Sequence, residues 1–521
     1  MKQIPSYVQD RWITGQGPAR ALVDPTTEEV IAEASTGGID FAACVEHART
    51  RGLPALQDMD FAARGALLEN VAQALHAHRD ELLELSTRSG GNTRGDAKFD
   101  VDGAIGTLAH YARLGKEFGP VRHLVDGEGV QTGRSPRAWG EHIHTPRRGV
   151  AVHVNAFNFP AWGLFEKAAV AWLAGMPVVA KPATSTCILA QRMVEIVVEQ
   201  NLLPPGALAL LCGSAGDLLD HLGGQDVIAF TGSSKTGALL RAHPCVVERG
   251  ARINVEADSL NAAVLDPAVE EDSETFDAFV REVVRDMTQK AGQKCTAIRR
   301  ILVPRERLSA VREALREELA RQPVGDPRRK GVKVGPLATA DQLRDVRAGV
   351  ERLAAAAKAV VGDGGRGDLV GEVGERGFFM APVLFEAQDP RTPAVHADEV
   401  FGPVATLLPT SGEPAEISEL VALGEGSLVS SIYSDRADFV REVALGIAPY
   451  NGRVYVGSAK TAGKSLGPGA VLPQLLHGGP GRAGAGEELG GPRGLAFYMQ
   501  RTALQGYKPL LEKTIGTAPR V

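Results

Sequence analysis

Short apolar runs alternate with amphipathic segments through the middle of the chain. The runs are rich in Val, Ile, Leu and Ala and occupy residues 150–154, 178–181, 208–211, 227–230 and 253–255. Between them, apolar residues recur at three- and four-residue steps, as on one face of a helix, at 162–174, 188–199, 216–222 and 236–243. Continuous apolar strands are buried on both faces, and helices between them imply parallel crossovers. The pattern predicts a doubly wound α/β sheet, whose ligand site lies beyond the carboxyl ends of its strands.

The flanking segments predict further helices and strands around this sheet. Residues 7–23 alternate and predict strands at the edge of the body, whereas 40–77 and 80–115 carry helical patterns. Residues 124–145 are polar and rich in Gly and then alternate, which predicts an extended hairpin leaving the body. A second α/β unit is indicated by helical segments at 273–290, 308–319 and 340–357 and by apolar runs at 301–303, 383–385, 404–408, 428–433 and 452–456. We expect residues 463–491 to form a loop and residues 495–498 to add a strand to another subunit's sheet.

Composition narrows the class of protein. The chain has 521 residues, 44% of them hydrophobic, but no apolar run approaches the ~18 residues of a membrane span. The first residues lack the apolar segment of a secretory signal. The five cysteines are scattered, odd in number and without metal-ligand spacing, so we expect a reduced cytoplasmic protein with no disulfide framework and no metal site. A formal net charge of -6 with dispersed Lys and Arg argues against a nucleic-acid partner.

Cys295 is the candidate nucleophile. It follows the predicted helix 273–290 in the run Gly292-Gln293-Lys294-Cys295-Thr296. A cysteine taken alone is more often a small buried hydrophobe. That interpretation holds for the four in apolar or ordinary contexts: Cys44, Cys187, Cys212 and Cys245. Cys295 differs because it lies after a helix and a glycine, in a polar turn that we expect to be open.

Two polar residues lie at strand ends that we expect to face this cysteine. Asn158 follows the strand 150–154, where it is either a helix cap or an amide that donates to a developing negative charge. Glu256 ends the strand 252–255. A partly buried carboxylate there would have a raised pKa and could activate water, and the alternative is an ion pair with a nearby Lys or Arg.

Two glycine-containing stretches are less specific. The run Phe230-Thr231-Gly232-Ser233-Ser234-Lys235-Thr236-Gly237 joins a strand to a helix start, where backbone N–H groups suit a phosphate. It matches neither common phosphate-binding glycine motif, and an ordinary β–α turn explains it equally well. Residues 478–484 form either a mobile segment at a substrate mouth or a linker.

In this order the stretches resemble the aldehyde dehydrogenase superfamily across almost the whole chain. The motifs that carry the resemblance are Phe157-Asn158-Phe159-Pro160, Lys181-Pro182-Ala183, Phe230-Thr231-Gly232-Ser233, Glu256, Gly292-Gln293-Lys294-Cys295 and Glu399-Val400-Phe401-Gly402-Pro403. Most members follow the glutamate with Gly-Gly, whereas this chain has Ala257-Asp258. This variant, together with the run from His477 to Gly484, is similar to one branch. That branch contains the dehydrogenase half of the bifunctional phenylacetate-catabolism enzyme and the 3,4-dehydroadipyl-CoA semialdehyde dehydrogenase of benzoate catabolism.

The resemblance implies a role for each matching catalytic position. Cys295 would attack an aldehyde as a thiolate, and the Asn158 side chain with the Cys295 N–H would hold the resulting oxyanion. Glu256 would activate the water that hydrolyses the thioester, and Lys167 would relay protons.

It also implies a nicotinamide cofactor site. Lys181 would hold the adenosine ribose, Ser233 the pyrophosphate and Glu399 the nicotinamide ribose. The site would be completed by Phe157, Ala183, Thr184, Gly232, Ala257 and Phe401. Relatives that prefer NAD commonly carry a glutamate where this chain has Thr184. A carboxylate there accepts from the ribose 2′-OH and repels a 2′-phosphate. Thr184 removes that repulsion and can donate a hydrogen bond, and Lys181 adds positive charge. We therefore predict an NADP preference with NAD tolerated.

The implied architecture is aldehyde dehydrogenase-like. It has a Rossmann-type cofactor domain (1–123 and 148–255), a second α/β catalytic domain (256–480) and a small β oligomerisation arm (124–147 and 481–521). We expect a homodimer or larger assembly and a CoA-linked aldehyde of aromatic-compound degradation as substrate. We expect the hydratase-like half of the bifunctional relative to be absent, which would make a separate hydratase a candidate partner. The basic clusters Arg147-Arg148 and Arg328-Arg329-Lys330 are either CoA contacts or solvated surface. The competing functions are a CoA-acylating dehydrogenase and a catalytically silent binding or scaffold protein.

Overall fold

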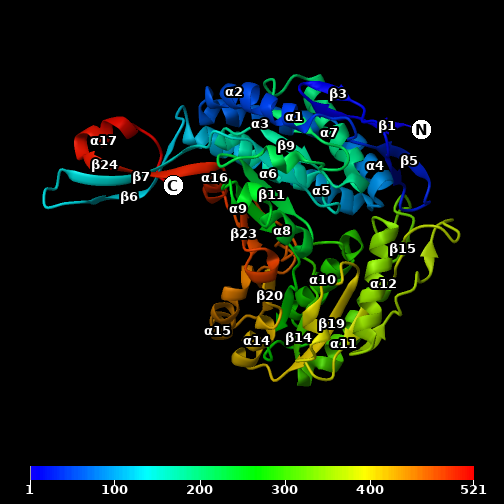
Figure 1. Ribbon diagram of the computed structural model, residues 1–521. Helices are drawn as coiled ribbons and strands as arrows, with labels where there is room; N and C mark the ends of the chain where they lie inside the picture. Colours follow the sequence, from blue (N-terminus) through cyan, green and yellow to red (C-terminus); the bar gives the residue numbers. More distant parts are fainter. Residues whose placement is uncertain (1) are drawn as a thin grey trace.

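A seven-stranded sheet forms the upper body of the computed structural model, which describes residues 2–521 (Figure 1). Its strand order is β12-β11-β8-β9-β10-β2-β3. The five parallel strands are β8 (Ala151–Val154), β9 (Val178–Lys181), β10 (Leu208–Leu210), β11 (Val227–Thr231) and β12 (Arg252–Glu256). The order reverses between β8 and β11, so the doubly wound topology predicted from the apolar runs is confirmed. A crevice is expected outside the carboxyl ends of those two strands.

Two antiparallel strands and a set of helices complete the upper body. β2 (Ser6–Val8) and β3 (Arg11–Ile13) extend the sheet, and β4 (Arg20–Val23) joins β1 (Gln3–Ile4) and β5 (Val30–Ala34) in a small sheet. The helices are α1 (Phe41–His47), α3 (Phe61–Ala77), α4 (Arg79–Gly90), α5 (Arg94–Phe118), α6 (Trp162–Ala174), α7 (Cys187–Glu199) and α8 (Ser234–Arg241). The helix predicted at 216–222 is wrong, because only a single 3-10 turn forms there at Leu218–His221. Of that turn only Leu218 is buried, so the segment offers too little apolar surface to extend it.

The lower body is built on a second seven-stranded sheet of order β16-β18-β19-β14-β13-β20-β21. Its strands are β13 (Ala262–Leu265), β14 (Arg300–Pro304), β16 (Lys358–Val361), β18 (Val383–Glu386), β19 (Val404–Thr410), β20 (Ser427–Tyr433) and β21 (Asn451–Gly457). Its helices include α10 (Glu274–Thr288), α11 (Leu308–Ala320), α12 (Ala340–Ala354), α14 (Pro414–Ala422) and α15 (Ala437–Ile447). The predicted strands are all present, and β13 and β16 are additional. All strands except the edge strand β16 are parallel to their neighbours.

A three-stranded arm projects from the body (Figure 1). It consists of β6 (Leu124–Gln131), β7 (Ala138–Pro146) and β24 (Met499–Tyr507), followed by α17 (Lys508–Ile515). The hairpin predicted at 124–145 is confirmed. The strand predicted at 495–498 is wrong, because these residues belong to helix α16 (Pro492–Tyr498), whose Leu495 and Tyr498 are buried one turn apart. The strand begins at Met499 and pairs with β7 of the same chain.

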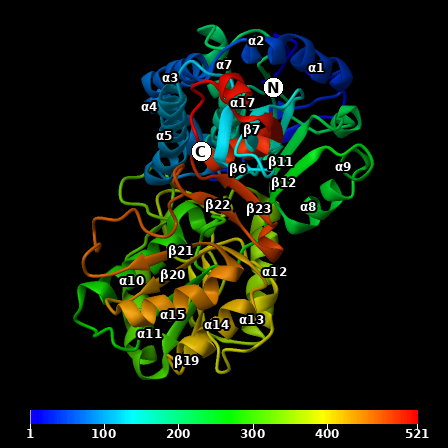
Figure 2. The ribbon, with the colours of Figure 1, turned by 90° about the vertical axis from the view of Figure 1, so that its left-hand side faces the viewer.

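A short hairpin lies between the two bodies (Figures 1 and 2). Its strands are β22 (Leu476–Gly479) and β23 (Gly486–Leu489), within the stretch that we expected to be a loop and partly in the arm. A Cβ on Gly478 would lie 2.0 Å from the carbonyl oxygen of Gly486, and one on Gly484 would lie 2.2 Å from that of Val255. These glycines therefore allow neighbouring backbone segments to pack closely, and they do not mark a flexible loop. The three-part domain division stays a prediction. Within residues 2–521, no helix has both the length and the apolar character to cross a membrane.

Candidate active site

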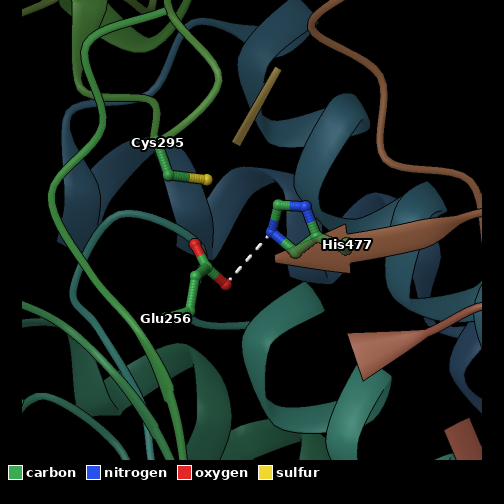
Figure 3. Close-up of side chains that lie close together, drawn as sticks. All are labelled: Glu256, Cys295 and His477. Carbon is green, nitrogen blue, oxygen red and sulfur yellow. Dashed lines mark ion pairs between the residues drawn. The ribbon is translucent and has the colours of Figure 1, made fainter. Parts of the chain in front are cut away.

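Four segments bring polar side chains together at the junction of the two bodies. Asn158 follows β8, Glu256 ends β12, Cys295 lies on the loop after α10, and His477 lies on β22. All four side chains line one small cavity of about 30 Å³. The reactive atoms of Glu256, Cys295 and His477 lie within 4.8 Å of one another (Figure 3). The three residues that the sequence singled out therefore share one pocket, and His477 joins them.

The backbone before Cys295 is bent into an unusual conformation. Lys290, Ala291 and Gly292 have φ values of 54°, 52° and 71°, in the left-handed region that only glycine adopts without strain. A Cβ on Gly292 would lie 2.2 Å from the carbonyl oxygen of Gly402. Strained backbone of this kind persists where surrounding contacts fix it. The turn lifts Cys295 into the pocket, where it is partly exposed while the four other cysteines are buried.

Two buried side chains hold the loop that carries Cys295. Asn261 donates from Nδ2 to the carbonyl oxygens of Cys295 and Ala297, both at 2.8 Å. Arg299 donates to the carbonyl oxygens of Gly292 at 2.9 Å and Gly402 at 2.7 Å. Asn261, the last residue of the run that begins at Glu256, thus holds the loop that carries the nucleophile. This role was not evident from the sequence.

Asn158 is placed as a hydrogen-bond donor in the pocket. The N-cap of α6 is Ala161, so Asn158 does not cap the helix. Its Nδ2 donates to the carbonyl oxygen of Gln293 at 3.1 Å, at the edge of the Cys295 loop. The Cys295 N–H makes no hydrogen bond to any described residue. Two donors therefore lie beside the sulfur, the arrangement that stabilises a developing oxyanion.

Glu256 forms an ion pair with a histidine. Its Oε2 lies 3.0 Å from Nε2 of His477, and the two side chains are only 2% and 5% exposed. Burial alone would raise the pKa of Glu256, but the charge and hydrogen bond of His477 and the charge of Lys167 outweigh it and lower that pKa to about 2. The expectation of a raised pKa was therefore wrong, because it weighed burial without the imidazole. The alternative interpretation, an ion pair with a Lys or Arg, is met in part, because the ion pair exists with His477.

The pKa of the Cys295 thiol is shifted in the opposite direction to that of Glu256. Burial and then the negative charge of Glu256 raise its pKa well above the ordinary value. The resting sulfur is consequently a protonated thiol with a carboxylate beside it, and attack requires a proton acceptor.

Lys167 lies among carboxylates, next to Glu256 and Cys295. Its Nζ is 2.9 Å from Glu166 and 3.2 Å from Glu488 of β23. Burial opposes its charge, but Glu166, Glu488 and Glu256 together raise the pKa of Lys167 above its ordinary value. Burial raises the pKa of Glu488 to about 7. Glu488 was missed in the sequence because its strand was interpreted as part of a loop.

The residues predicted to bind a cofactor lie at the carboxyl ends of β8, β9, β11 and β12. Thr184 begins a 3-10 turn after Lys181 and Ala183, and its Oγ1 donates to the carbonyl oxygen of Gly213 at 3.0 Å. In this structure the hydroxyl proton is directed to a backbone oxygen, and a hydrogen bond from Thr184 to a ligand stays a prediction. Ser233 is the N-cap of α8, and its hydroxyl accepts from the N–H of Thr236. Gly232 donates its N–H to the Glu256 carbonyl oxygen, which ties the β11 turn to β12.

The opposite wall comes from the segment after α13 (Ala394–Ala397). Glu399 accepts from the Ser259 N–H at 3.2 Å and forms an ion pair with Arg299 at 3.5 Å. Burial raises the pKa of Glu399 to about 7. Its buried Oε1 is the oxygen that pairs with Arg299, and it could also accept a hydrogen bond from a ribose hydroxyl. The Phe157 and Phe401 rings meet edge to face at 5.9 Å. Ala257 is also buried here, and its N–H donates to the Ala483 carbonyl oxygen. These residues fit a dinucleotide.

A larger cavity of about 590 Å³ adjoins the Cys295 pocket and shares with it Phe99, Trp162, Gly469 and Val471. Three cations line it: Lys98 and Arg113 on α5, and Arg285 on α10. Among the described residues Lys98 and Arg113 have no ion-pair partner, and Nη2 of Arg285 has no hydrogen bond. Two carboxylates also line the cavity: Asp102 pairs with Arg79, and Asp286 pairs with Lys294 at 2.9 Å and lies 3.9 Å from Arg285.

The two basic clusters named from the sequence lie elsewhere. Arg147 donates to the carbonyl oxygens of Gln225 and Gly224, and Arg328 pairs with Asp326.

Comparisons with known proteins give a consistent result. A model of the aldehyde dehydrogenase family matches residues 12–504. The 3,4-dehydroadipyl-CoA semialdehyde dehydrogenase of Aromatoleum evansii is 46% identical over 482 residues, which cover 92% of this chain and 93% of that protein. Protein MaoC of Klebsiella aerogenes is 43% identical over 183 residues, which cover 35% of this chain and 53% of that protein. A betaine aldehyde dehydrogenase from Staphylococcus aureus, solved in complex with NAD+, has a TM-score of 0.82 at 22% identity and covers 97% of this chain and 95% of its own.

Proposed function

Because the chain belongs to the aldehyde dehydrogenase family, we propose that it oxidises a CoA-linked semialdehyde to the carboxylic acid, with NADP as oxidant and Cys295 as nucleophile. The observation that carries the cysteine mechanism is the convergence of Cys295, Asn158 and Glu256 in one pocket. A nucleophile, an oxyanion donor and a carboxylate base are the groups that acyl chemistry on an aldehyde requires.

The chain's residues act in two stages. Cys295 loses its proton to the adjacent carboxylate of Glu256 and adds to the aldehyde carbon, while Asn158 Nδ2 and the Cys295 N–H hold the oxygen. The dinucleotide, when bound, accepts the hydride, and a thioester on Cys295 remains. Once the thiol proton has left Glu256 by way of Lys167, the ionised carboxylate takes a proton from water, and the water attacks the thioester. Glu256 gives this second proton to the Cys295 sulfur as the acid leaves. Lys167, between Glu166 and Glu488, carries the proton away from the site.

The cavity with three cations supports a substrate that carries CoA. The relative from Aromatoleum evansii is named for a CoA-linked semialdehyde. Phosphates of such a substrate need positive charge at a distance from the reacting carbon. Lys98, Arg113 and Arg285 supply that charge in the cavity next to the Cys295 pocket. The pantetheine arm would pass along Phe99 and Trp162, whose rings contact each other edge to face and line both cavities.

The surroundings of Lys181 support NADP. Lys181 lies at the end of β9, where burial lowers its pKa and the charge of Arg20 adds to that effect. Two neighbouring cations repel each other unless an anion lies between them. A 2′-phosphate would supply that anion, and Thr184 places no carboxylate to oppose it.

The arm supports assembly with a second copy of the chain. Val130 of β6, Tyr507 of β24 and Leu510 of α17 are 59%, 51% and 60% exposed. Large apolar side chains exposed on a projecting arm favour burial against a partner. The proposed assembly is a homodimer or larger.

Product analysis tests the proposal. Aldehydes with and without a CoA thioester are incubated with NADP, and the products are identified by mass. We expect free acid, a higher kcat/KM for the CoA-linked aldehyde, and complete loss of oxidation in Cys295→Ala. A thioester product formed with added CoA would instead identify an acylating enzyme. Oxidation that persists in Cys295→Ala would refute the cysteine mechanism, and inactivity of the wild type with every aldehyde would favour a binding protein.

A further inference from the structure

His477 occupies a position against the catalytic carboxylate that the proposed mechanism does not yet use. Its Nε2 lies 3.0 Å from Oε2 of Glu256, and both side chains are buried. The other carboxylate oxygen, Oε1, faces the side on which Cys295 lies (Figure 3). Oε1 is buried and has no hydrogen-bond partner among residues 2–521. In the Glu256 carboxylate, Oε2 is therefore held by His477, whereas Oε1 accepts no hydrogen bond from a described residue.

The strand that carries His477 is fixed by backbone contacts. His477 pairs across the hairpin with Glu488, and Gly479 pairs with Gly486. A Cβ on Gly452 of β21 would lie 1.7 Å from the carbonyl oxygen of Gly478, so β22 is packed directly on the second sheet. An imidazole on so confined a strand has little freedom to leave Glu256.

We propose that His477 is a positioning residue for Glu256, which holds the carboxylate by donating from Nε2 to Oε2 and directs the free Oε1 toward the Cys295 thioester. This proposal rests on the proposed function, because it concerns the step in which Glu256 activates water. Without the imidazole, the side chain can rotate, and the buried carboxylate loses its nearest positive charge.

The groups around the pair determine its charge. Glu256 is faced by His477 from β22, by Lys167 and Glu166 from α6, by Glu488 from β23 and by the thiol of Cys295. His477 is faced by Glu256, by Glu166 from α6 and by Glu488 from β23. Burial lowers the pKa of His477, but these carboxylates outweigh it and raise that pKa above its ordinary value. Each member of the pair therefore favours the charged form of the other.

The sign of the pH effect follows from these charges. Glu256 works as a base only when it is ionised, so activity falls as pH drops through its pKa in the folded protein. Removal of His477 leaves burial to raise that pKa, opposed by the charge of Lys167 and by the adjacent Cys295 thiol. The acid limb of the kcat profile must then move to higher pH. A histidine that only fills space would leave the limb in place when an aromatic ring of similar size replaces it.

The test compares His477→Phe and His477→Gln with the wild type. His144→Gln is a matched control, because His144 is also buried and lies 3.6 Å from a carboxylate, Asp126, in the arm. Steady-state kcat is measured against pH, and the first turnover is followed as a burst of NADPH. We expect His477→Phe to lower kcat about 10- to 100-fold. Its acid limb should rise by about one to two pH units. A burst should appear because acylation outpaces hydrolysis.

His477→Gln keeps an N–H donor without the charge, so its kcat should lie between those of the wild type and His477→Phe. It also serves as the test variant if His477→Phe does not fold. KM for NADP should be unchanged in both variants, and His144→Gln should keep the wild-type profile. A His477→Phe enzyme with wild-type kcat and an unmoved acid limb overturns the positioning role. Absence of NADPH formation by the wild type would refute the proposed function instead, so the two failures are distinct.

Discussion

Replacing Thr184 by glutamate tests the basis of cofactor choice. The new carboxylate would lie on the turn after β9, near Lys181 and facing the 2′ position of a bound dinucleotide under the proposed function. It would neutralise part of the positive field of Lys181 and repel a 2′-phosphate directly. With NAD the same carboxylate would find a hydroxyl to accept from. The substitution should therefore lower activity with NADP and spare or improve activity with NAD.

The size of the effect follows from Coulomb's law. Two unit charges at about 4 Å interact with about 4 kcal/mol at an effective dielectric constant of about 20. Thr184 is only half-buried, so solvent screening reduces the interaction to about 1–2 kcal/mol. Since 1.4 kcal/mol corresponds to a factor of ten, we expect kcat/KM for NADP to fall roughly 5- to 30-fold.

Thr184→Gln is the matched control for this substitution. Glutamine has nearly the size of glutamate, and it also removes the hydrogen bond from Thr184 to the Gly213 carbonyl oxygen, but it adds no charge. The assay is kcat/KM for NADP and NAD at a fixed saturating aldehyde. A Thr184→Gln enzyme that loses as much NADP activity as Thr184→Glu would show that the hydrogen bond matters rather than the charge. A wild type that strongly prefers NAD would refute the reasoning from the start.

Two further substitutions test the outer cavity and the loop that carries the nucleophile. Lys98→Gln combined with Arg113→Gln should raise KM for a CoA-linked aldehyde about tenfold by weakening phosphate contacts, and should leave KM for a simple aliphatic aldehyde unchanged. Lys116→Gln, an exposed cation on the same helix outside that cavity, is its control, and equal KM values for the double variant and the control would exclude the phosphate site. Gly292→Ala should destabilise the protein by about 1–3 kcal/mol and reduce activity at least tenfold, because its φ is 71° and the new Cβ would lie 2.2 Å from the Gly402 carbonyl oxygen. Gly463→Ala has a similar φ of 68° but nothing within 4 Å, so thermal inactivation and kcat that change equally in the two variants would refute the steric argument.

Periodicity and strand-end position were sufficient to predict most of the fold and the centre of the site. The parallel strands of the first sheet are continuous apolar runs, and parallel order brings their carboxyl ends to one edge, so Asn158 and Glu256 could be expected to meet. Cys295 was identified because it lies in a glycine-containing turn directly after an amphipathic helix. The short strand β13, whose sequence is only Ala-Ala-Val-Leu, gave no signal that distinguished it from a loop.

The hairpin β22–β23 could not be found this way, and the chemistry that it carries was missed with it. Glycine normally weakens a strand, so a run of glycines predicts a turn. Here the glycines are required by close contacts with other backbone segments, and such contacts exist only in the folded molecule. The direction of the Glu256 pKa shift was wrong for the same reason. It depends on His477, which is 221 positions away in the sequence and reaches Glu256 only through the register of that hairpin.

Because of that register, the hairpin β22–β23 contributes one residue to each of two buried ion pairs, His477 with Glu256 and Glu488 with Lys167. His477 and Glu488 are direct cross-strand partners, so their positions are coupled by the backbone. His477 supplies positive charge to Glu256, and Glu488 supplies negative charge to Lys167. Lys167 in turn lowers the pKa of Glu256. A displacement of the hairpin would weaken both contacts at once and leave buried charges uncompensated, which is strongly unfavourable in a site with little water. The proposed base and the proposed proton relay are therefore expected to fail together when the hairpin is perturbed, although their charged groups lie on different elements.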